Sequence, residues 1–188
     1  GGEEREVTIL FSDIRGFTTM SEKMRPEDVV STLNEYFSDM IDIVFKHNGT
    51  LDKIIGDELM IVYGAPISAD DDTERAVATA VEMQESILEL NKTRKKQKKK
   101  PIQVGMGINR GVVVSGNIGS RDMMDYTVIG DTVNLGSRLC SAAGPGEILV
   151  SRTVWKEIKE IFVCKKLKPV RVKGKKDRVG VYRIASSN

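Results

Sequence analysis

The sequence predicts an α+β fold in which helices pack on a single sheet. Its 188 residues, 40% of them hydrophobic, suffice for one sizeable core but not for two ordinary domains. Short β-rich runs and longer amphipathic helices follow one another in the order strand, helix, strand, strand, helix, strand. That order is typical of the split βαβ, or ferredoxin-like, sheet.

Composition narrows the functional classes. Lys and Arg number 29 against 27 Asp and Glu, so neither a coating of nucleic acid nor a polyacidic role is indicated. Cys140 and Cys164 are too few for a disulfide framework, which favours a reducing, cytoplasmic setting. No apolar run approaches the roughly 20 residues that cross a bilayer. We therefore expect a globular domain with no nucleic acid polymer as partner and no membrane contact of its own, although a longer protein around it could be membrane-attached.

The first strand and helix have clear signals. A strand is expected from Val7 to Phe11, followed by a loop that contains Gly16. A helix is expected from Pro26, because proline suits a first helical turn, and Asn48-Gly49 ends it. Its apolar residues recur at three- and four-residue steps: Val30, Leu33, Phe37, Met40, Ile41 and Val44.

A hairpin and a second helix come next. The apolar runs 51–55 and 59–63 predict two strands joined by a tight turn at Gly56-Asp57. The acidic residues 70–72 offer an N-cap for a helix with a second apolar stripe. The stripe consists of Ala76, Val77, Ala80, Val81, Met83, Ile87 and Leu90.

The second half of the sequence predicts a strand pair at 102–108 and 112–117, a third helix at 132–143 and a C-terminal strand region. The Lys-rich segment 92–100 lies between a helix end and a strand. A basic patch for nucleic acid or membrane is one interpretation. We favour a solvated loop, because the segment has no interleaved aromatic residues.

Two acidic residues stand at strand ends. Asp13 follows the first strand, and Asp57 lies in the hairpin turn. In a split βαβ sheet the first strand lies beside such a hairpin, so the two carboxylates are expected to converge. Paired carboxylates suit hard cations such as Mg²⁺, and the loop 14–19 offers backbone N–H groups to phosphate oxygens. The alternative is that each Asp only caps a loop or serves a turn.

Three blocks of the sequence carry a specific resemblance. They are FSDIRGFT at 11–18, KIIGD at 53–57 and DTVNLGSR at 131–138. In this order and spacing they resemble the signature blocks of class III nucleotide cyclase catalytic domains. The resemblance spans nearly the whole chain and implies a domain at 5–185, with 1–2 interpreted as a cloning scar and 186–188 as a frayed tail.

The resemblance implies a metal site and a catalytic pair. Asp13 and Asp57, with Ile14 beside them, would bind two Mg²⁺ or Mn²⁺ ions per active site. Phe17 and Thr18 of the following loop would contact the substrate. Asn134 and Arg138 would steady the ribose and the charge on the α-phosphate; their four-residue spacing places them on one helix face.

The base-reading positions of the family fall on Lys53 and Thr127. Lysine is typical of adenylate cyclases, and threonine marks the subgroup called class IIIb. An ammonium can donate to adenine N1, and a hydroxyl can accept from the 6-amino group. The resemblance therefore implies ATP as substrate and cyclic AMP as product.

The triphosphate contacts are less defined. Lys173, in Val172-Lys173-Gly174-Lys175, resembles the family's phosphate-binding lysine, and a solvated strand edge is the alternative. Some members have Arg after the Gly of Asn109-Arg110-Gly111, where this chain has Val112. Which Arg assists the triphosphate is left open.

In this family the active site lies between two catalytic domains. One chain that holds both sets of residues implies a head-to-tail homodimer with shared sites. The segment 120–125 resembles the arm that reaches across to the partner. A guanylate cyclase that uses GTP, or a catalytically silent dimerisation or regulatory module, are the alternatives to an adenylate cyclase.

Overall fold

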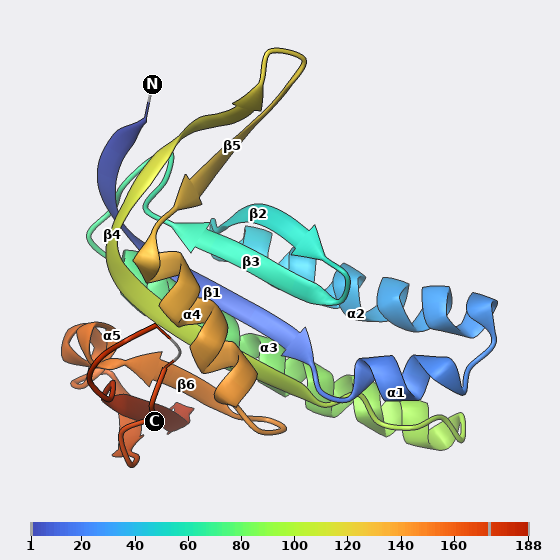
Figure 1. The fold of residues 1–188 in the computed structure, drawn as a ribbon. Coiled ribbons are helices and arrows are strands. Elements are labelled where there is room, and N and C mark those ends of the chain that lie inside the picture. The colour runs from blue at the N-terminus through green and yellow to red at the C-terminus, as the bar shows by residue number, and fades with distance from the viewer. Residues whose placement is uncertain (1, 173, 188) are drawn as a thin grey trace.

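Eight strands and five helices make up the described part of the chain, a computed structural model of residues 2–172 and 174–187. The strands are β1 (Glu3–Ile14), β2 (Thr50–Ile55), β3 (Glu58–Tyr63), β4 (Val104–Ser120), β5 (Met123–Ile129), β6 (Ile148–Ser151), β7 (Phe162–Lys166) and β8 (Val181–Ser187). The helices are α1 (Phe17–Glu22), α2 (Pro26–Lys46), α3 (Asp72–Lys96), α4 (Asp131–Ala142) and α5 (Arg152–Ile158). The strands all belong to one sheet (Figure 1).

The sheet has the order β2-β3-β1-β4-β6-β8-β7, and β5 extends it as the hairpin partner of β4. β1 lies between β3 and β4 and is antiparallel to both, whereas β4 and β6 pair in parallel. From β1 through α2, β2, β3 and α3 to β4, the elements follow the expected order of a split βαβ sheet. The predicted α+β fold is therefore confirmed.

Helices cover both faces of the sheet (Figure 1). α2 and α3 pack on one face, where Leu10 of β1 joins a cluster with Tyr36 and Met83. α4 packs on the opposite face, where Phe11 joins a cluster with Cys140. Neighbouring residues of β1 thus serve opposite layers, as the two-residue period of a strand requires.

One long strand replaces the predicted strand pair at 102–108 and 112–117. β4 continues through residues 109–111, which pair with residues 7–9 of β1. A Cβ at Gly111 would lie only 2.6 Å from Thr132 Oγ1 on α4. Glycine serves close packing here and not a turn, so the predicted break was wrong.

Two segments predicted as loops are partly helical. The segment after β1 forms α1, which begins directly after Gly16, whose φ of 68° lies in the left-handed region. α3 continues to Lys96, so residues 92–96 of the Lys-rich segment are helical. Arg94 is buried there and forms an ion pair with Glu35 of α2 at 2.8 Å. Residues 92–96 are therefore helical and not a loop; Arg94 packs against α2, whereas residues 92, 93, 95 and 96 are exposed to solvent, as predicted.

The C-terminal strand is longer than expected. Residues 186 and 187, predicted as part of a frayed tail, belong to β8 and pair with β7, because β7 offers them a free edge. Gly1 and Asn188 lie outside the described residues. Within the described ranges, the longest helices are too polar to span a bilayer.

Candidate active site

Asp13 and Asp57, here called the acid pair, come together at one end of the sheet. β3 runs antiparallel beside β1, with Leu59 opposite Ser12, so the β2–β3 turn that holds Asp57 lies next to the end of β1. The backbone N–H of Ile14 donates a hydrogen bond to Asp57 Oδ2 at 3.1 Å. The structure thus brings the two predicted acids together, and their role as metal ligands stays a prediction.

The electrostatics of the acid pair favour a cation. Burial, together with the hydrogen bond and the charge of Asp57, raises the pKa of Asp13 to about 7. Burial and the charge of Asp57 also raise the pKa of Glu58. Arg15 opposes both shifts without cancelling them. A divalent cation would relieve the remaining repulsion.

Arg15 connects the acid pair to α4, a role that the sequence analysis did not assign. Its guanidinium donates to Asp13 Oδ2 at 3.3 Å and to the carbonyl oxygens of Cys140 and Ala143 at 3.1 and 3.0 Å. These carbonyls lie at the C-terminal end of α4, where a cation also suits the helix dipole. Cys140 is 125 residues away along the chain, so no local pattern indicated this contact.

A cavity of about 320 Å³ opens over the acid pair. Its lining consists of residues 13–19, Asp57 and Ser141. Phe17 and Thr18 of the predicted substrate site therefore lie beside the acids; Thr18 is exposed, and Phe17 is half-buried against the core. Because α1 begins at Phe17, the helix leaves its first backbone N–H groups without a partner of its own, and they can donate to an anion.

The acid pair fits a metal that shares its ligands with a substrate. Among the described residues, no three His, Cys, Asp or Glu side chains gather into a cluster that could hold a metal. Mg²⁺ binds through one or two carboxylates and fills its other positions with water and substrate phosphates. Two close carboxylates at an open cavity match that preference. The donor set therefore suits Mg²⁺ or Mn²⁺ delivered with a phosphorylated ligand.

Lys53 and Thr127 meet through a residue that the sequence analysis missed. Thr127 Oγ1 on β5 donates to both carboxylate oxygens of Asp52 on β2, at 2.9 Å each, and Lys53 Nζ lies 3.6 Å from Asp52 Oδ1. The Asp52 side chain is only 5% exposed, against 43% for that of Lys53. These three residues, here called the base cluster, form one connected group. An acidic residue inside a β-rich run was the signal that could have revealed Asp52.

Asn134 and Arg138 lie four residues apart on one face of α4. The helix sits close to β4, since a Cβ on Gly107 would lie 2.2 Å from the backbone nitrogen of Cys140. Asn134 is exposed and Arg138 is partly exposed. Neither lines the cavity over the acid pair, and the base cluster does not line it either. Residues that the predicted chemistry needs together thus lie apart within one chain.

The predicted triphosphate contacts find limited support. Lys173 lies outside the described residues. Its neighbour Lys175 forms an ion pair with Asp131, the first residue of α4. Arg110 donates to Glu6 Oε1 at 2.9 Å, so it stabilises the pairing of β1 with β4 at a distance from the acid pair.

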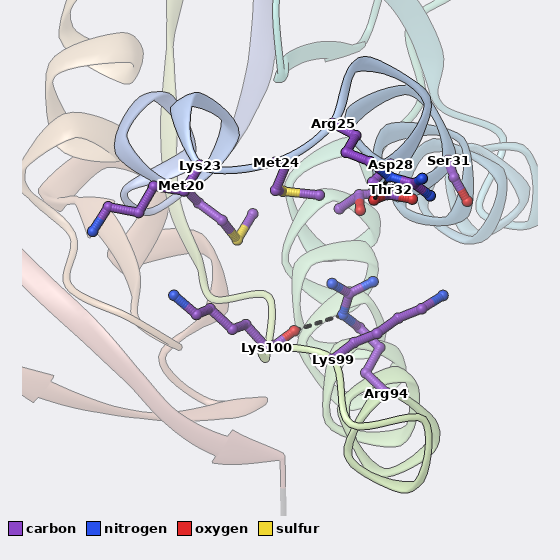
Figure 2. A pocket seen from close by; sticks show the side chains of 10 residues that line it. All are labelled: Met20, Lys23, Met24, Arg25, Asp28, Ser31, Thr32, Arg94, Lys99 and Lys100. Carbon is purple, nitrogen blue, oxygen red and sulfur yellow. Dashed lines mark hydrogen bonds and ion pairs between the residues drawn. The ribbon is translucent and has the colours of Figure 1, made fainter.

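A second cavity, of about 340 Å³, lies between α1, the start of α2 and the segment after α3 (Figure 2). Its wall is rich in cations: Lys23, Arg25, Arg94, Lys99 and Lys100. Arg94 pairs with Glu35, and Arg25 with Asp28. Arg94 Nε also donates to the carbonyl oxygen of Lys100 at 2.7 Å, the dashed line in Figure 2. These contacts anchor the Lys-rich segment and involve none of the predicted site residues.

Sequence comparison matches the chain to a known family. Residues 2–186 match the family described as the Adenylate and Guanylate cyclase catalytic domain. The chain is also 36% identical to an adenylate cyclase of Anabaena cylindrica, over 96% of this chain. The matched region spans 37% of that relative's length, so it corresponds to one part of a larger protein.

Two solved structures are similar throughout. The adenylyl cyclase CyaB from P. aeruginosa superposes with a TM-score of 0.96 and 38% identity, covering 100% of this chain and 97% of that one. The guanylyl cyclase Cya2 gives a TM-score of 0.92 and 41% identity, covering 100% of this chain and 95% of that one. One of these structures is named an adenylyl cyclase and the other a guanylyl cyclase. Similarity alone therefore does not decide whether this chain uses an adenine or a guanine nucleotide.

Proposed function

The chain belongs to the adenylate and guanylate cyclase catalytic domain family, and from this premise we propose that it converts ATP to 3′,5′-cyclic AMP and pyrophosphate. The observation that carries the proposal is the acid pair at an open cavity. In this reaction the ribose 3′-oxygen bonds to the α-phosphorus while the bond to the β-phosphate oxygen breaks. Pyrophosphate leaves, and the 3′-hydroxyl proton passes to solvent. We place this lyase activity, a step of cyclic nucleotide signalling, in residues 5–185.

Asp13 and Asp57, with Ile14 beside them, would hold two Mg²⁺ or Mn²⁺ ions. When bound, the ions would neutralise the triphosphate and make the 3′-hydroxyl easier to deprotonate. The chain's own part is to keep the carboxylates in position, which the Ile14 N–H and the β2–β3 turn do before a ligand arrives. Phe17 and Thr18 line the same cavity, where backbone N–H groups can donate to phosphate oxygens.

The preference for ATP is supported by the base cluster. Lys53 can only donate, and adenine N1 can only accept. The Thr127 hydroxyl can accept from the adenine 6-amino group. The contact of both residues with Asp52 supports a joint role in reading one base.

We propose that a second copy of the chain completes each site. The acid pair of one protomer would face Asn134 and Arg138 and the base cluster of its partner, because one chain keeps these groups apart. The β4–β5 hairpin projects from the sheet (Figure 1). Its exposed apolar side chains would supply a surface for such a dimer. Its exposed apolar residues are Val112, Val114, Ile118, Met123, Met124, Tyr126 and Ile129.

A direct assay tests the proposal. The purified protein is incubated with ATP or GTP, each with Mg²⁺ or Mn²⁺, and the products are separated by chromatography. We expect cyclic AMP from ATP, no product after chelation of the metal, and loss of product in Asp57→Asn. Absence of product from either nucleotide would favour a silent dimerisation or regulatory module.

Guanylate cyclase activity is the second candidate, because the similar Cya2 is a guanylyl cyclase. Lys53 argues against it, since guanine carries a hydrogen on N1 and an ammonium has no lone pair to accept it. Preferred turnover of GTP in the same assay would establish this second candidate.

A further inference from the structure

Asp52 is a nearly buried acid to which the proposed reaction assigns no contact with the substrate. Its side chain is 5% exposed, and both of its oxygens accept from the Thr127 hydroxyl. Lys53 supplies the opposing charge from 3.6 Å. A charge is buried at considerable cost unless it is paired and hydrogen-bonded, so this position calls for a specific explanation.

A β-bulge brings Asp52 and Lys53 together. Adjacent residues of a regular strand point to opposite faces of the sheet. The register of β2 against β3 shifts between Leu51 and Lys53, which makes Asp52 the extra residue of the bulge. The two side chains can therefore meet although they are neighbours in sequence. Bulges often re-aim a side chain next to an active site.

The Asp52 carboxylate also determines how the Thr127 hydroxyl can act. A free hydroxyl has one hydrogen and two lone pairs, so it can either donate or accept. Here the hydrogen is directed at Asp52, whose oxygens both lie 2.9 Å from Thr127 Oγ1. A carboxylate has no hydrogen to offer in return. Toward any other ligand, Thr127 is therefore an acceptor.

We propose that Asp52 is a positioning residue that sets the base specificity of this chain. It holds Thr127 as an acceptor and anchors Lys53 as a donor; the inference rests on the proposed function. Adenine presents a 6-amino donor and an N1 acceptor, which match this pair. Guanine presents a 6-carbonyl acceptor and an N1–H donor, which oppose it at both points. A site whose polar groups would be left unpaired rejects such a ligand strongly.

Asp52→Asn tests the inference, because the amide has the shape of the carboxylate but carries hydrogens of its own. The amide can donate to Thr127 Oγ1, which frees the hydroxyl hydrogen for an outside acceptor, and its neutral charge releases Lys53. We expect the ratio of kcat/KM for ATP to that for GTP to fall by about tenfold, mainly through a higher KM for ATP. Asp42→Asn, at an exposed acid of α2, is the matched control and should leave the ratio unchanged.

Variants of Thr127 separate positioning from a structural role. Thr127→Ser keeps the hydroxyl and should keep the ratio, whereas Thr127→Val should lower it. Combining Thr127→Val with Asp52→Asn should lower the ratio by less than the product of the two separate effects, because both changes act on the same hydroxyl and only the release of Lys53 is added. If Asp52→Asn does not fold, Asp52→Ser also removes the charge and has the same expected effect.

The inference is overturned if Asp52→Asn keeps the ratio within about twofold of the unmodified protein while Thr127→Val lowers it. Failure of the proposed function looks different, because the unmodified protein would then prefer GTP or turn over neither nucleotide. That result would overturn the proposed function and, with it, the role of Asp52.

Discussion

The acid pair and the base cluster bury negative charge in opposite ways. At the acid pair, two carboxylates approach each other with partial relief from Arg15, and the pKa of Asp13 rises to about 7. At the base cluster, Asp52 is more deeply buried, yet a hydroxyl and an ammonium accompany it. The first region carries charge that the protein compensates only in part, whereas the charge of the second is paired and hydrogen-bonded before any ligand arrives.

This difference indicates what each region can contribute. A cation at the acid pair gains from the relief of repulsion, so this region suits the binding of a metal–triphosphate complex. The base cluster has a fixed donor and a fixed acceptor, and a prearranged site discriminates without a cost for ordering its groups. Binding energy and selectivity would then come from separate parts of the chain that meet across a dimer.

The largest expected effect tests whether the two regions meet in this way. Asp57→Ala removes half of the acid pair, and Arg138→Ala removes a residue of the proposed other half-site. Each variant alone should lose cyclase activity by about a thousandfold or more, because each damages both sites of its homodimer. In an equimolar mixture, heterodimers have one intact site, and activity should recover to about a quarter of the unmodified level.

The control for this experiment is a mixture of Asp57→Ala with Asp13→Ala, which damages the same half-site twice and should stay inactive. Subunit exchange is verified by pull-down of differently tagged chains. If the first mixture stays inactive despite exchange, the two regions do not meet across a dimer.

A smaller effect on cyclase activity is expected from a substitution in the base cluster. Lys53→Ala removes the charged donor and leaves the Asp52 carboxylate without its ammonium. We expect kcat/KM for ATP to fall by about tenfold to a hundredfold. Affinity for Mn²⁺, measured by paramagnetic resonance, should stay unchanged because the proposed metal site is the acid pair. Lys166→Ala, at an exposed lysine of β7, is the control. A parallel loss of Mn²⁺ affinity would show that the two regions are coupled within one chain.

The central fold was predictable because its signals are local. Apolar periodicity and end signals located α2, the β2–β3 hairpin and α4, which was expected at 132–143 and is observed at Asp131–Ala142. The break predicted within β4 was wrong because Gly111 is required by a contact with Thr132, a residue distant in sequence. Local patterns carry no information about such contacts.

The candidate site shows the same division. Asp13 and Asp57 were predicted from their places at strand ends, and Lys53 and Thr127 from the family resemblance. Asp52 was missed because its partner Thr127 lies 75 residues away along the chain. The residues that hold a site in position are often identified only by such long-range contacts.

Arg15 gives the smallest expected effect, and it acts on stability more than on chemistry. It is the contact through which the acid pair touches α4, the helix that carries Asn134 and Arg138. Arg15→Ala should lower the free energy of unfolding by about 2 kcal/mol, because carbonyl groups at the end of α4 lose their donor. For a chain of this size, the melting temperature measured by circular dichroism should then fall by about 4 to 8 °C.

Arg15→Lys is the control for this variant. It keeps a charge near Asp13 but cannot reach several carbonyls at once, so its melting temperature should lie between those of the unmodified protein and Arg15→Ala. Equal melting temperatures for Arg15→Lys and Arg15→Ala would mean that the carbonyl contacts, and not the charge, account for the whole effect. An unchanged melting temperature in Arg15→Ala would contradict the stabilising role of Arg15 and leave α4 held by its close packing on Gly107.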